Sequence, residues 1–207
     1  MPTPLVLGTT NSGKLRELLE LLAPHGVGCE SLAGLTGAVE VEETGATFAE
    51  NAALKAGQQA VALGRWVLAE DSGLVVPFLG GGPGIRSARF SGLSAESGRE
   101  AVDAANNRLL LERLAGATGI ERAAHYACHA ALADPSGRIV AVASGTCGGM
   151  IATEPAGGGG FGYDPLFIVP EYHRTFGELL PDVKAVISHR ARAMREMLPA
   201  VVRALVS

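Results

Sequence analysis

A short apolar segment that runs through a glycine-bearing polar turn into a helix is the feature that most constrains this fold. Residues 5–7 are Leu-Val-Leu, which is typical of a short buried strand. We expect Asn11 or Ser12 to cap the helix that follows. The apolar stripe of this helix, at positions i, i+3, i+4 and i+7, consists of Leu15, Leu18, Leu19 and Leu22.

The turn before this helix is a candidate phosphate site. A helix start presents unpaired N–H groups and a partial positive charge, and Lys14 adds a full charge in the first turn. The turn is not a Walker A P-loop, although Gly8, Gly13 and Lys14 fit that spacing. Leu15 stands where the motif has the Ser or Thr that binds Mg²⁺. The alternative is an ordinary connection between strand and helix with an exposed lysine.

The composition indicates a globular chain and excludes several classes of protein. With 207 residues and 47% hydrophobic content, the chain can bury a sizeable core. A net charge of −4 argues against non-specific binding of nucleic acid, and no apolar run reaches membrane-spanning length. Residues 1–4 lack the pattern of a signal peptide, and the three cysteines, Cys29, Cys128 and Cys147, form no C-x-x-C pair. We therefore expect a cytoplasmic location.

The scarcity of lysine singles out three positions. The chain has fourteen arginines but three lysines, Lys14, Lys55 and Lys184. A lysine provides a compact ammonium group where a planar guanidinium does not fit. We therefore treat all three as candidate functional residues, with chance retention as the alternative.

A second helix is predicted by its N-terminal signals. Thr47 and Glu50 form a capping box at the start of an alanine-rich segment that reaches about Leu63. Asn51 and Lys55 are four residues apart, so they share one face of this helix.

Two acidic pairs stand next to these elements. Residues 42–43 are glutamates in a segment that is commonly a solvated turn. The apolar residues 66–69 predict a buried strand that ends at Glu70 and Asp71. Carboxylates buried there without partners are costly, which favours a metal site or a general base. The alternative is an Asx-type turn over residues 71–73.

The remaining pattern alternates strands with helices. We expect a strand over residues 27–32, a helix capped by Ser97 and Glu100 that reaches about Leu114, and a β-hairpin around residues 134–137. This order implies an α/β fold, a mixed sheet flanked by helices, in one domain spanning residues 1–207. The glycine-rich loops near residues 84 and 157 would separate two lobes.

A glycine run followed by aromatic residues is the second unusual segment. Residues 157–160 are all glycine and leave the backbone open to close approach by a ligand. Phe161 and Tyr163 offer faces on which a base could stack, and Asp164 could accept a hydrogen bond from a ring N–H. The alternative is a hairpin loop whose aromatic side chains pack on the core.

The chain resembles the inosine/xanthosine triphosphate pyrophosphatases, from about residue 5 to residue 200. The motifs that carry the resemblance occur in family order: Thr10-Asn11-Ser12-Gly13-Lys14, Glu42-Glu43-Thr44-Gly45, Glu50-Asn51-Ala52-Ala53-Leu54-Lys55-Ala56, Glu70-Asp71-Ser72-Gly73-Leu74, Pro83-Gly84, Ser87-Ala88-Arg89, Gly160-Phe161-Gly162-Tyr163-Asp164-Pro165 and Ser188-His189-Arg190. Glu70 departs from the pattern, because the family often has Asp there.

The resemblance implies an activity and an architecture. The expected reaction is hydrolysis of ITP, dITP or XTP to the monophosphate and pyrophosphate, with Mg²⁺, by a homodimer. The expected fold is an elongated mixed sheet with a nucleotide cleft between two lobes.

The resemblance also implies the roles of individual residues. Asp71, Lys14 and Lys55 would be catalytic, and Glu42 with Asp71 would bind the metal ion. The substrate would contact Thr9, Thr10, Asn11, Ser12, Gly13, Lys14, Ser72, Phe161, Gly162, Tyr163, Asp164, Lys184, His189 and Arg190. Donors from His189 or Arg190 aimed at the 6-keto oxygen would favour hypoxanthine and xanthine over adenine.

Two other functions remain open from the residues alone. A regulator could bind a nucleoside triphosphate without cleaving it, although binding alone needs no positioned base such as Asp71. A related pyrophosphatase could instead act on pyrimidine triphosphates.

Overall fold

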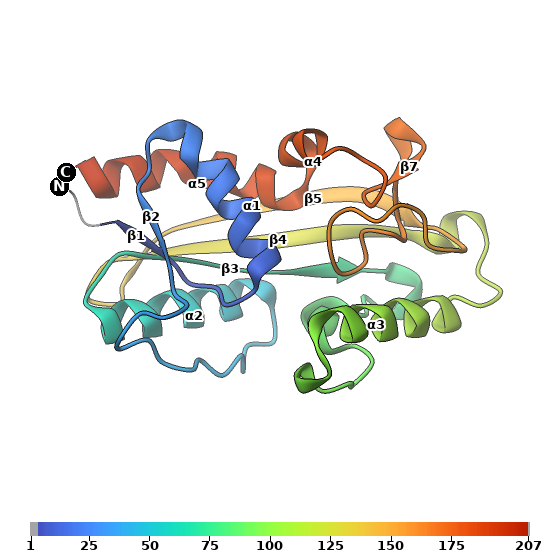
Figure 1. The fold of residues 1–207 in the computed structure, drawn as a ribbon, viewed down its shortest axis with the longest axis horizontal. Coiled ribbons are helices and arrows are strands. Elements are labelled where there is room, and N and C mark those ends of the chain that lie inside the picture. The colour runs from blue at the N-terminus through green and yellow to red at the C-terminus, as the bar shows by residue number, and fades with distance from the viewer. Residues whose placement is uncertain (1–3, 207) are drawn as a thin grey trace. The chain divides into compact units, whose positions relative to one another are not determined.

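The computed structural model describes residues 4–206, apart from the side chains at positions 95 and 206, and has the α/β fold that the sequence predicts (Figure 1). A seven-stranded mixed sheet is flanked by helices, in the strand order β2-β1-β3-β4-β5-β6-β7. The strands are β1 Leu5–Leu7, β2 Cys29–Ser31, β3 Val67–Val75, β4 Ala123–Ala133, β5 Ile139–Ile151, β6 Phe167–Val169 and β7 Arg174–Thr175. The helices are α1 Ser12–Leu22, α2 Phe48–Leu63, α3 Arg99–Arg113, α4 Pro181–Ile187 and α5 His189–Val206. Residues 1–3, on which the prediction about a signal peptide partly rests, lie outside this description.

The parallel part of the sheet is built around β1. This strand pairs in parallel with β2 and with β3, and its three residues are completely buried, as the apolar segment predicts. Asn11 caps α1 by accepting hydrogen bonds from the N–H groups of Gly13 and Lys14. β2 is shorter than the predicted strand over residues 27–32. The predicted hairpin is confirmed: a tight turn joins β4 to β5, where Asp134 N–H donates to Arg138 O.

The chain forms two compact units. The first contains the residues up to Asp71, Cys128–Gly145 and the residues from Ser188 onward, and the second contains Ser72–Ala127 and Thr146–Ile187. The glycine-rich loops near residues 84 and 157 therefore do not separate the units, because both lie inside the second one. The chain instead passes between units within β3, β4 and β5, since long strands continue through both.

The first unit has a core on each face of its strands. On one face, α1 and α5 pack on residues such as Leu7, Leu68 and Cys128. On the other face, the small residues of α2 pack on Val67 and Ala69. The capping box that starts α2 is confirmed, since Thr47 and Glu50 each accept the other's backbone N–H.

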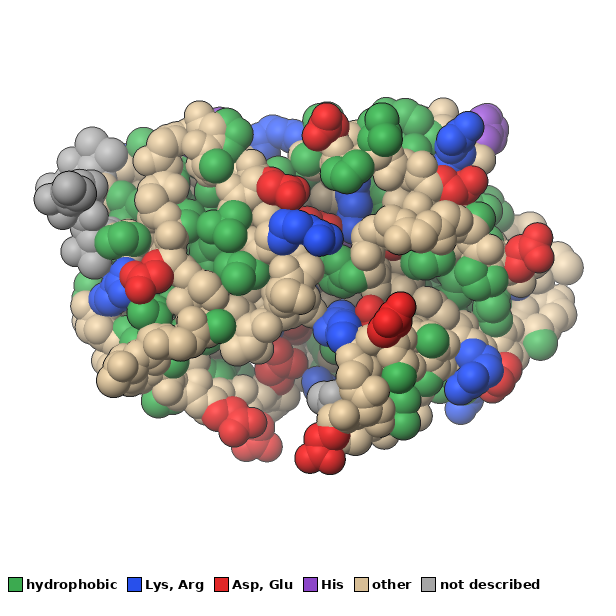
Figure 2. Space-filling model, viewed as in Figure 1, with side chains coloured by type: hydrophobic (Ala, Val, Ile, Leu, Met, Phe, Trp, Pro, Cys, Tyr) green, Lys and Arg blue, Asp and Glu red, His purple; other side chains and the backbone are tan. Residues whose placement is uncertain are grey.

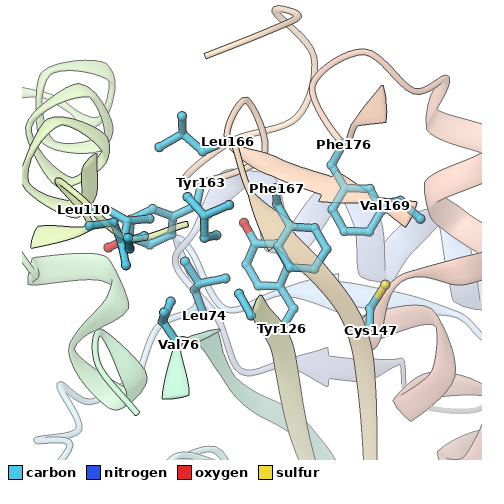
Figure 3. Packing of buried hydrophobic residues seen from close by; sticks show 14 residues of the cluster. Leu74, Val76, Leu110, Tyr126, Cys147, Tyr163, Leu166, Phe167, Val169 and Phe176 are labelled. Carbon is cyan, nitrogen blue, oxygen red and sulfur yellow. The ribbon is translucent and has the colours of Figure 1, made fainter. Parts of the chain in front are cut away.

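The core of the second unit combines aliphatic side chains with a group of aromatic rings, which we call the aromatic core (Figure 3). The rings of Tyr126 and Phe167 lie 4.7 Å apart between centroids, and those of Phe167 and Phe176 lie 5.2 Å apart. α3 adds Leu110 to this core. This helix begins after Gly98, whose φ of 87° suits glycine, so the prediction that Ser97 caps it was wrong.

No helix between residues 4 and 206 is long and apolar enough to cross a membrane. Within residues 4–206, no disulfide bond joins any of the three cysteines. Acidic and basic side chains are interspersed on the face that Figure 2 shows.

The close approach of α5 to β5 gives a prediction about stability. A Cβ atom on Gly145 would lie 2.3 Å from the carbonyl oxygen of His189 and 2.5 Å from the nitrogen of Ala193. Because both are backbone atoms of α5, Gly145→Ala should lower the free energy of unfolding by about 3 kcal/mol through overpacking. The measurement is chemical denaturation.

The matched control is Gly148→Ala in the same strand, where nothing lies within 4 Å of the added carbon. This variant should unfold at nearly the same denaturant concentration as the original protein. Equal stability of the two variants would contradict the proposed packing.

Candidate functional site

The turn between β1 and α1 has the close packing and the cap that a phosphate turn needs. A Cβ atom on Gly8 would lie 2.9 Å from Cβ of Ala69, so the turn lies directly against β3. The Asn11 side chain accepts from the N–H groups of Gly13 at 3.0 Å and Lys14 at 3.1 Å. The other polar residues expected to contact substrate here, Thr9, Thr10 and Ser12, are half-buried or exposed.

β3 separates the two adjacent carboxylates. The sequence places Glu70 and Asp71 at the end of a strand, but β3 continues through them to Val75, and the alternative of an Asx-type turn is wrong. Neighbouring residues of a strand point to opposite faces. Glu70 therefore lies on the side of α1 and α5, and Asp71 on the side of α2.

Asp71 is held by two side chains of α2. It accepts a hydrogen bond from Asn51 Nδ2 at 3.2 Å and from Lys55 Nζ at 3.1 Å, and it is 6% exposed. The predicted common face of Asn51 and Lys55 is thus the face that contacts Asp71. Burial alone would lower the pKa of Lys55, but the negative charges of Asp71 and Glu43 outweigh it and raise that pKa above 10.5. The ammonium group stays charged.

Of the two adjacent glutamates, Glu43 belongs to this cluster. Its carboxylate contacts Lys55 Nζ at 2.9 Å, whereas Glu42, to which the resemblance assigned metal binding, is exposed. Asn51 fixes the segment that carries both, because its Oδ1 accepts the N–H of Gly45 at 2.8 Å. The alternative of a solvated acidic turn therefore fits Glu42 and not Glu43.

Glu70 is the buried centre of a second group of charges. It contacts Lys14 Nζ at 3.2 Å and the Arg190 guanidinium at 3.2 Å, and its side chain has no exposed surface. Arg190 also binds Glu17. Burial acts against the charge of Arg190, but these two carboxylates outweigh it and raise the pKa of Arg190.

Arg190 therefore has a different position from the predicted one. The sequence suggested that it donates to a purine 6-keto oxygen, but the guanidinium is 1% exposed and donates to two carboxylates. His189, the other expected donor, is 4% exposed at the start of α5. Glu17 was missed by sequence reasoning, although its position three residues after Lys14 puts it on the same helix face.

In the second unit, Asp164 and Lys184 form a buried ion pair. The Lys184 ammonium donates to Asp164 Oδ2 and lies 4.9 Å from the centroid of the Phe161 ring. Asp164 also accepts from the Phe161 N–H at 2.9 Å and from the Tyr126 hydroxyl at 3.3 Å. The carboxylate thus organises its own loop, rather than presenting the open acceptor that the sequence suggested.

The two aromatic residues of this loop have different environments. Tyr163 is 3% exposed, lies beside Leu110 and Leu74 in Figure 3, and donates its hydroxyl to Ser87 O at 2.9 Å. The Tyr163 ring therefore presents no open face for stacking in this structure, and the alternative of core packing fits it. Phe161 lies outside that core and is half-buried. Ser72, the remaining expected contact, is half-buried in β3.

The described residues bring no three His, Cys, Asp or Glu side chains together as a ready-made metal site. Mg²⁺ commonly binds through one or two carboxylates together with the phosphates of a substrate. Asp71 and Glu43 contact the same ammonium group and are of that type. The donor set therefore fits Mg²⁺ only in combination with a phosphate-bearing ligand.

The two adjacent carboxylates of β3 thus each contact a lysine, Glu70 with Lys14 and Asp71 with Lys55, in an α/β fold. The sequence profile of the Ham1 family matches residues 5–200, and the chain belongs to this family. The resemblance found in the sequence motifs is thereby confirmed.

Close relatives and solved structures agree with this assignment. The chain is 49% identical over 199 residues to the dITP/XTP pyrophosphatase of Rhodopirellula baltica, which covers 96% of this chain and 93% of the relative. It is 50% identical over 193 residues to the dITP/XTP pyrophosphatase of an Exiguobacterium species, with 93% and 94% covered. A HAM1 protein from Coxiella burnetii has a similar structure, with a TM-score of 0.83 at 37% identity over 97% of this chain and 98% of that one.

The buried position of Glu70 gives a second prediction about stability. Glu70→Gln removes the negative charge between Lys14 and Arg190 but keeps the shape of the side chain. Because breaking a buried pair leaves uncompensated charge, the free energy of unfolding should fall by about 3–5 kcal/mol.

The control is Glu30→Gln, which breaks an ion pair with Arg65 whose side chains are 42% and 20% exposed. Exposed pairs contribute little, so its loss should be below about 1 kcal/mol. Urea denaturation of both variants compares the two, and similar losses would contradict the role of Glu70.

Proposed function

We propose that this chain hydrolyses dITP, ITP and XTP to the nucleoside monophosphate and pyrophosphate. The names of its close full-length relatives support dITP and XTP as substrates. The observation that carries the proposal is the position of Asp71. Asn51 and Lys55 hold its carboxylate, and the β1–α1 turn lies against the same strand.

The proposed reaction is attack of water on the α-phosphorus of the triphosphate. The bond from this phosphorus to the bridging oxygen breaks, and pyrophosphate leaves. Asp71 orients the attacking water and accepts its proton, while Lys14 and Lys55 offset negative charge on the phosphate oxygens. The short contacts of both lysines with carboxylates fix their positions before substrate binds.

The charge of the cluster supports a role for Mg²⁺. On the α2 side of β3, Lys55 faces two carboxylates, those of Glu43 and Asp71. A triphosphate would add further negative charge to a group that is already net negative. Mg²⁺, held by Asp71 and Glu43, would neutralise phosphate charge and polarise the reacting group.

The remaining proposals concern the base and the assembly. Phe161 would stack on the purine, beside Lys184 and Asp164, and His189 would donate to the 6-keto oxygen. Because Arg190 is engaged by two carboxylates, the proposal for keto recognition rests on His189. We further propose a homodimer in the cytoplasm, as the resemblance implies.

The experiment that tests the proposed function is pyrophosphate release from dITP, XTP, GTP, ATP and dTTP, with Mg²⁺ and with excess chelator. Release should occur with dITP and XTP, and the chelator should abolish it. For ATP, kcat/KM should be about 10⁴-fold lower, because a site that hydrogen-bonds a keto group rejects an amino group.

Other outcomes would select the rival functions. Tight nucleotide binding without release would favour the regulator. Release mainly from dTTP would favour a pyrimidine pyrophosphatase.

The two neighbouring glutamates offer a matched pair of variants. Glu43→Gln removes a carboxylate that contacts Lys55, whereas Glu42→Gln changes an exposed side chain. We expect Glu43→Gln to lower kcat by about 10²-fold and to raise the Mg²⁺ concentration needed for half-maximal activity. Glu42→Gln should change kcat and this Mg²⁺ concentration by less than about twofold. The measurement is activity as a function of Mg²⁺ concentration. If Glu42→Gln needed more Mg²⁺ for half-maximal activity than Glu43→Gln, metal binding would be assigned to Glu42 instead.

A further inference from the structure

One face of α3 contacts the loop that carries Phe161. Arg99, Asp103 and Asn107 are each four residues apart and therefore share this face. None of them belongs to a motif that the proposed function uses. All three lie in the second unit with the loop that they contact.

Two of these side chains bind both polar backbone groups of a single residue. Asp103 Oδ2 accepts the N–H of Gly162 at 2.9 Å, and Asn107 Nδ2 donates to the carbonyl oxygen of Gly162 at 3.0 Å. Gly162 has a φ of 62°, a conformation that other residues rarely adopt. The two bonds, made from successive turns of α3, fix the peptide planes on either side of this glycine.

The same helix face also contacts the Phe161 ring. The Arg99 guanidinium carbon lies 5.8 Å from the ring centroid, and Arg99 Nε contacts Asp103 Oδ1 at 3.0 Å. The Phe161 N–H donates to Asp164. Polar and cation–π contacts therefore act on both the backbone and the ring of Phe161.

Asp103 and Asn107, which together we call the clamp on Gly162, have a feature that stability alone does not explain. Asn107 Oδ1 is buried and accepts no hydrogen bond from any residue between 4 and 206. An unpaired buried acceptor costs free energy, so Asn107 is held in this orientation at a cost to folding. What the orientation provides is the donor to Gly162.

We propose that Asp103 and Asn107 are positioning residues for base recognition, which hold Phe161-Gly162 so that the Phe161 ring is oriented to stack on the purine. The inference rests on the proposed function. The preceding run of four glycines has no side chains with which to order the loop, so anchors must come from elsewhere. Ordering the ring in advance removes an entropic cost from substrate binding.

The test compares Asp103→Ala and Asn107→Ala with Glu112→Gln, an exposed position on the same helix. Two inhibitors of dITP hydrolysis distinguish binding of the base from binding of the phosphates. Inosine monophosphate carries the base, and imidodiphosphate carries phosphates alone. Each of the two alanine variants should raise the KM for dITP and the inhibition constant of inosine monophosphate by about tenfold. The kcat and the inhibition constant of imidodiphosphate should change by less than about twofold, as should every parameter of Glu112→Gln.

A double variant tests whether the two side chains act together. If both hold the same glycine, Asp103→Ala combined with Asn107→Ala should raise KM by about as much as either change alone. A rise of about a hundredfold, the product of two independent effects, would overturn the shared clamp.

Three results would overturn the proposal, and each differs from failure of the proposed function. Unchanged KM in both variants would show that the clamp does not affect the base. Equal weakening of both inhibitors, or a fall in melting temperature that accounts for lost activity, would show a general structural role. If the original protein released no pyrophosphate from dITP or XTP, the proposed function itself would fail.

Discussion

The step from Glu70 to Asp71 along β3 is the constraint on which the first unit depends. A strand turns successive side chains to opposite faces, so two adjacent carboxylates enter two different cores. Each would be unstable there without a cation. Lys14 of α1 contacts Glu70, and Lys55 of α2 contacts Asp71. The positions of both helices on the sheet therefore depend on these ion pairs as well as on apolar packing.

Both units contain lysine side chains that are held by a carboxylate. In the second unit Asp164 holds Lys184 beside Phe161, much as Asp71 and Glu43 hold Lys55. A long, flexible lysine side chain is otherwise disordered in solution, and a carboxylate contact fixes its nitrogen atom. Charges that are already in position cost little free energy to reorganise when a charged substrate reacts. This is a main source of electrostatic stabilisation of the transition state in enzymes.

The sequence predicted those parts of the site that depend on local geometry. The Asn11 cap, the capping box of α2 and the shared face of Asn51 and Lys55 follow from helix periodicity, and the structure has all three. It did not predict the pairing of Arg190 with Glu17, because 173 residues separate them in the chain. Likewise, the burial of Tyr163 and the choice between Glu42 and Glu43 depend on contacts with other elements, which no local pattern encodes.

The low lysine content has a consequence for chemical modification. Each of the three lysine side chains is at most 15% exposed and is paired with a carboxylate. The exposed cations are arginines, which do not react with amine-directed reagents. Acetylation, amine-coupled immobilisation or fluorescent labelling of a lysine in this chain can therefore occur only by breaking one of these three ion pairs.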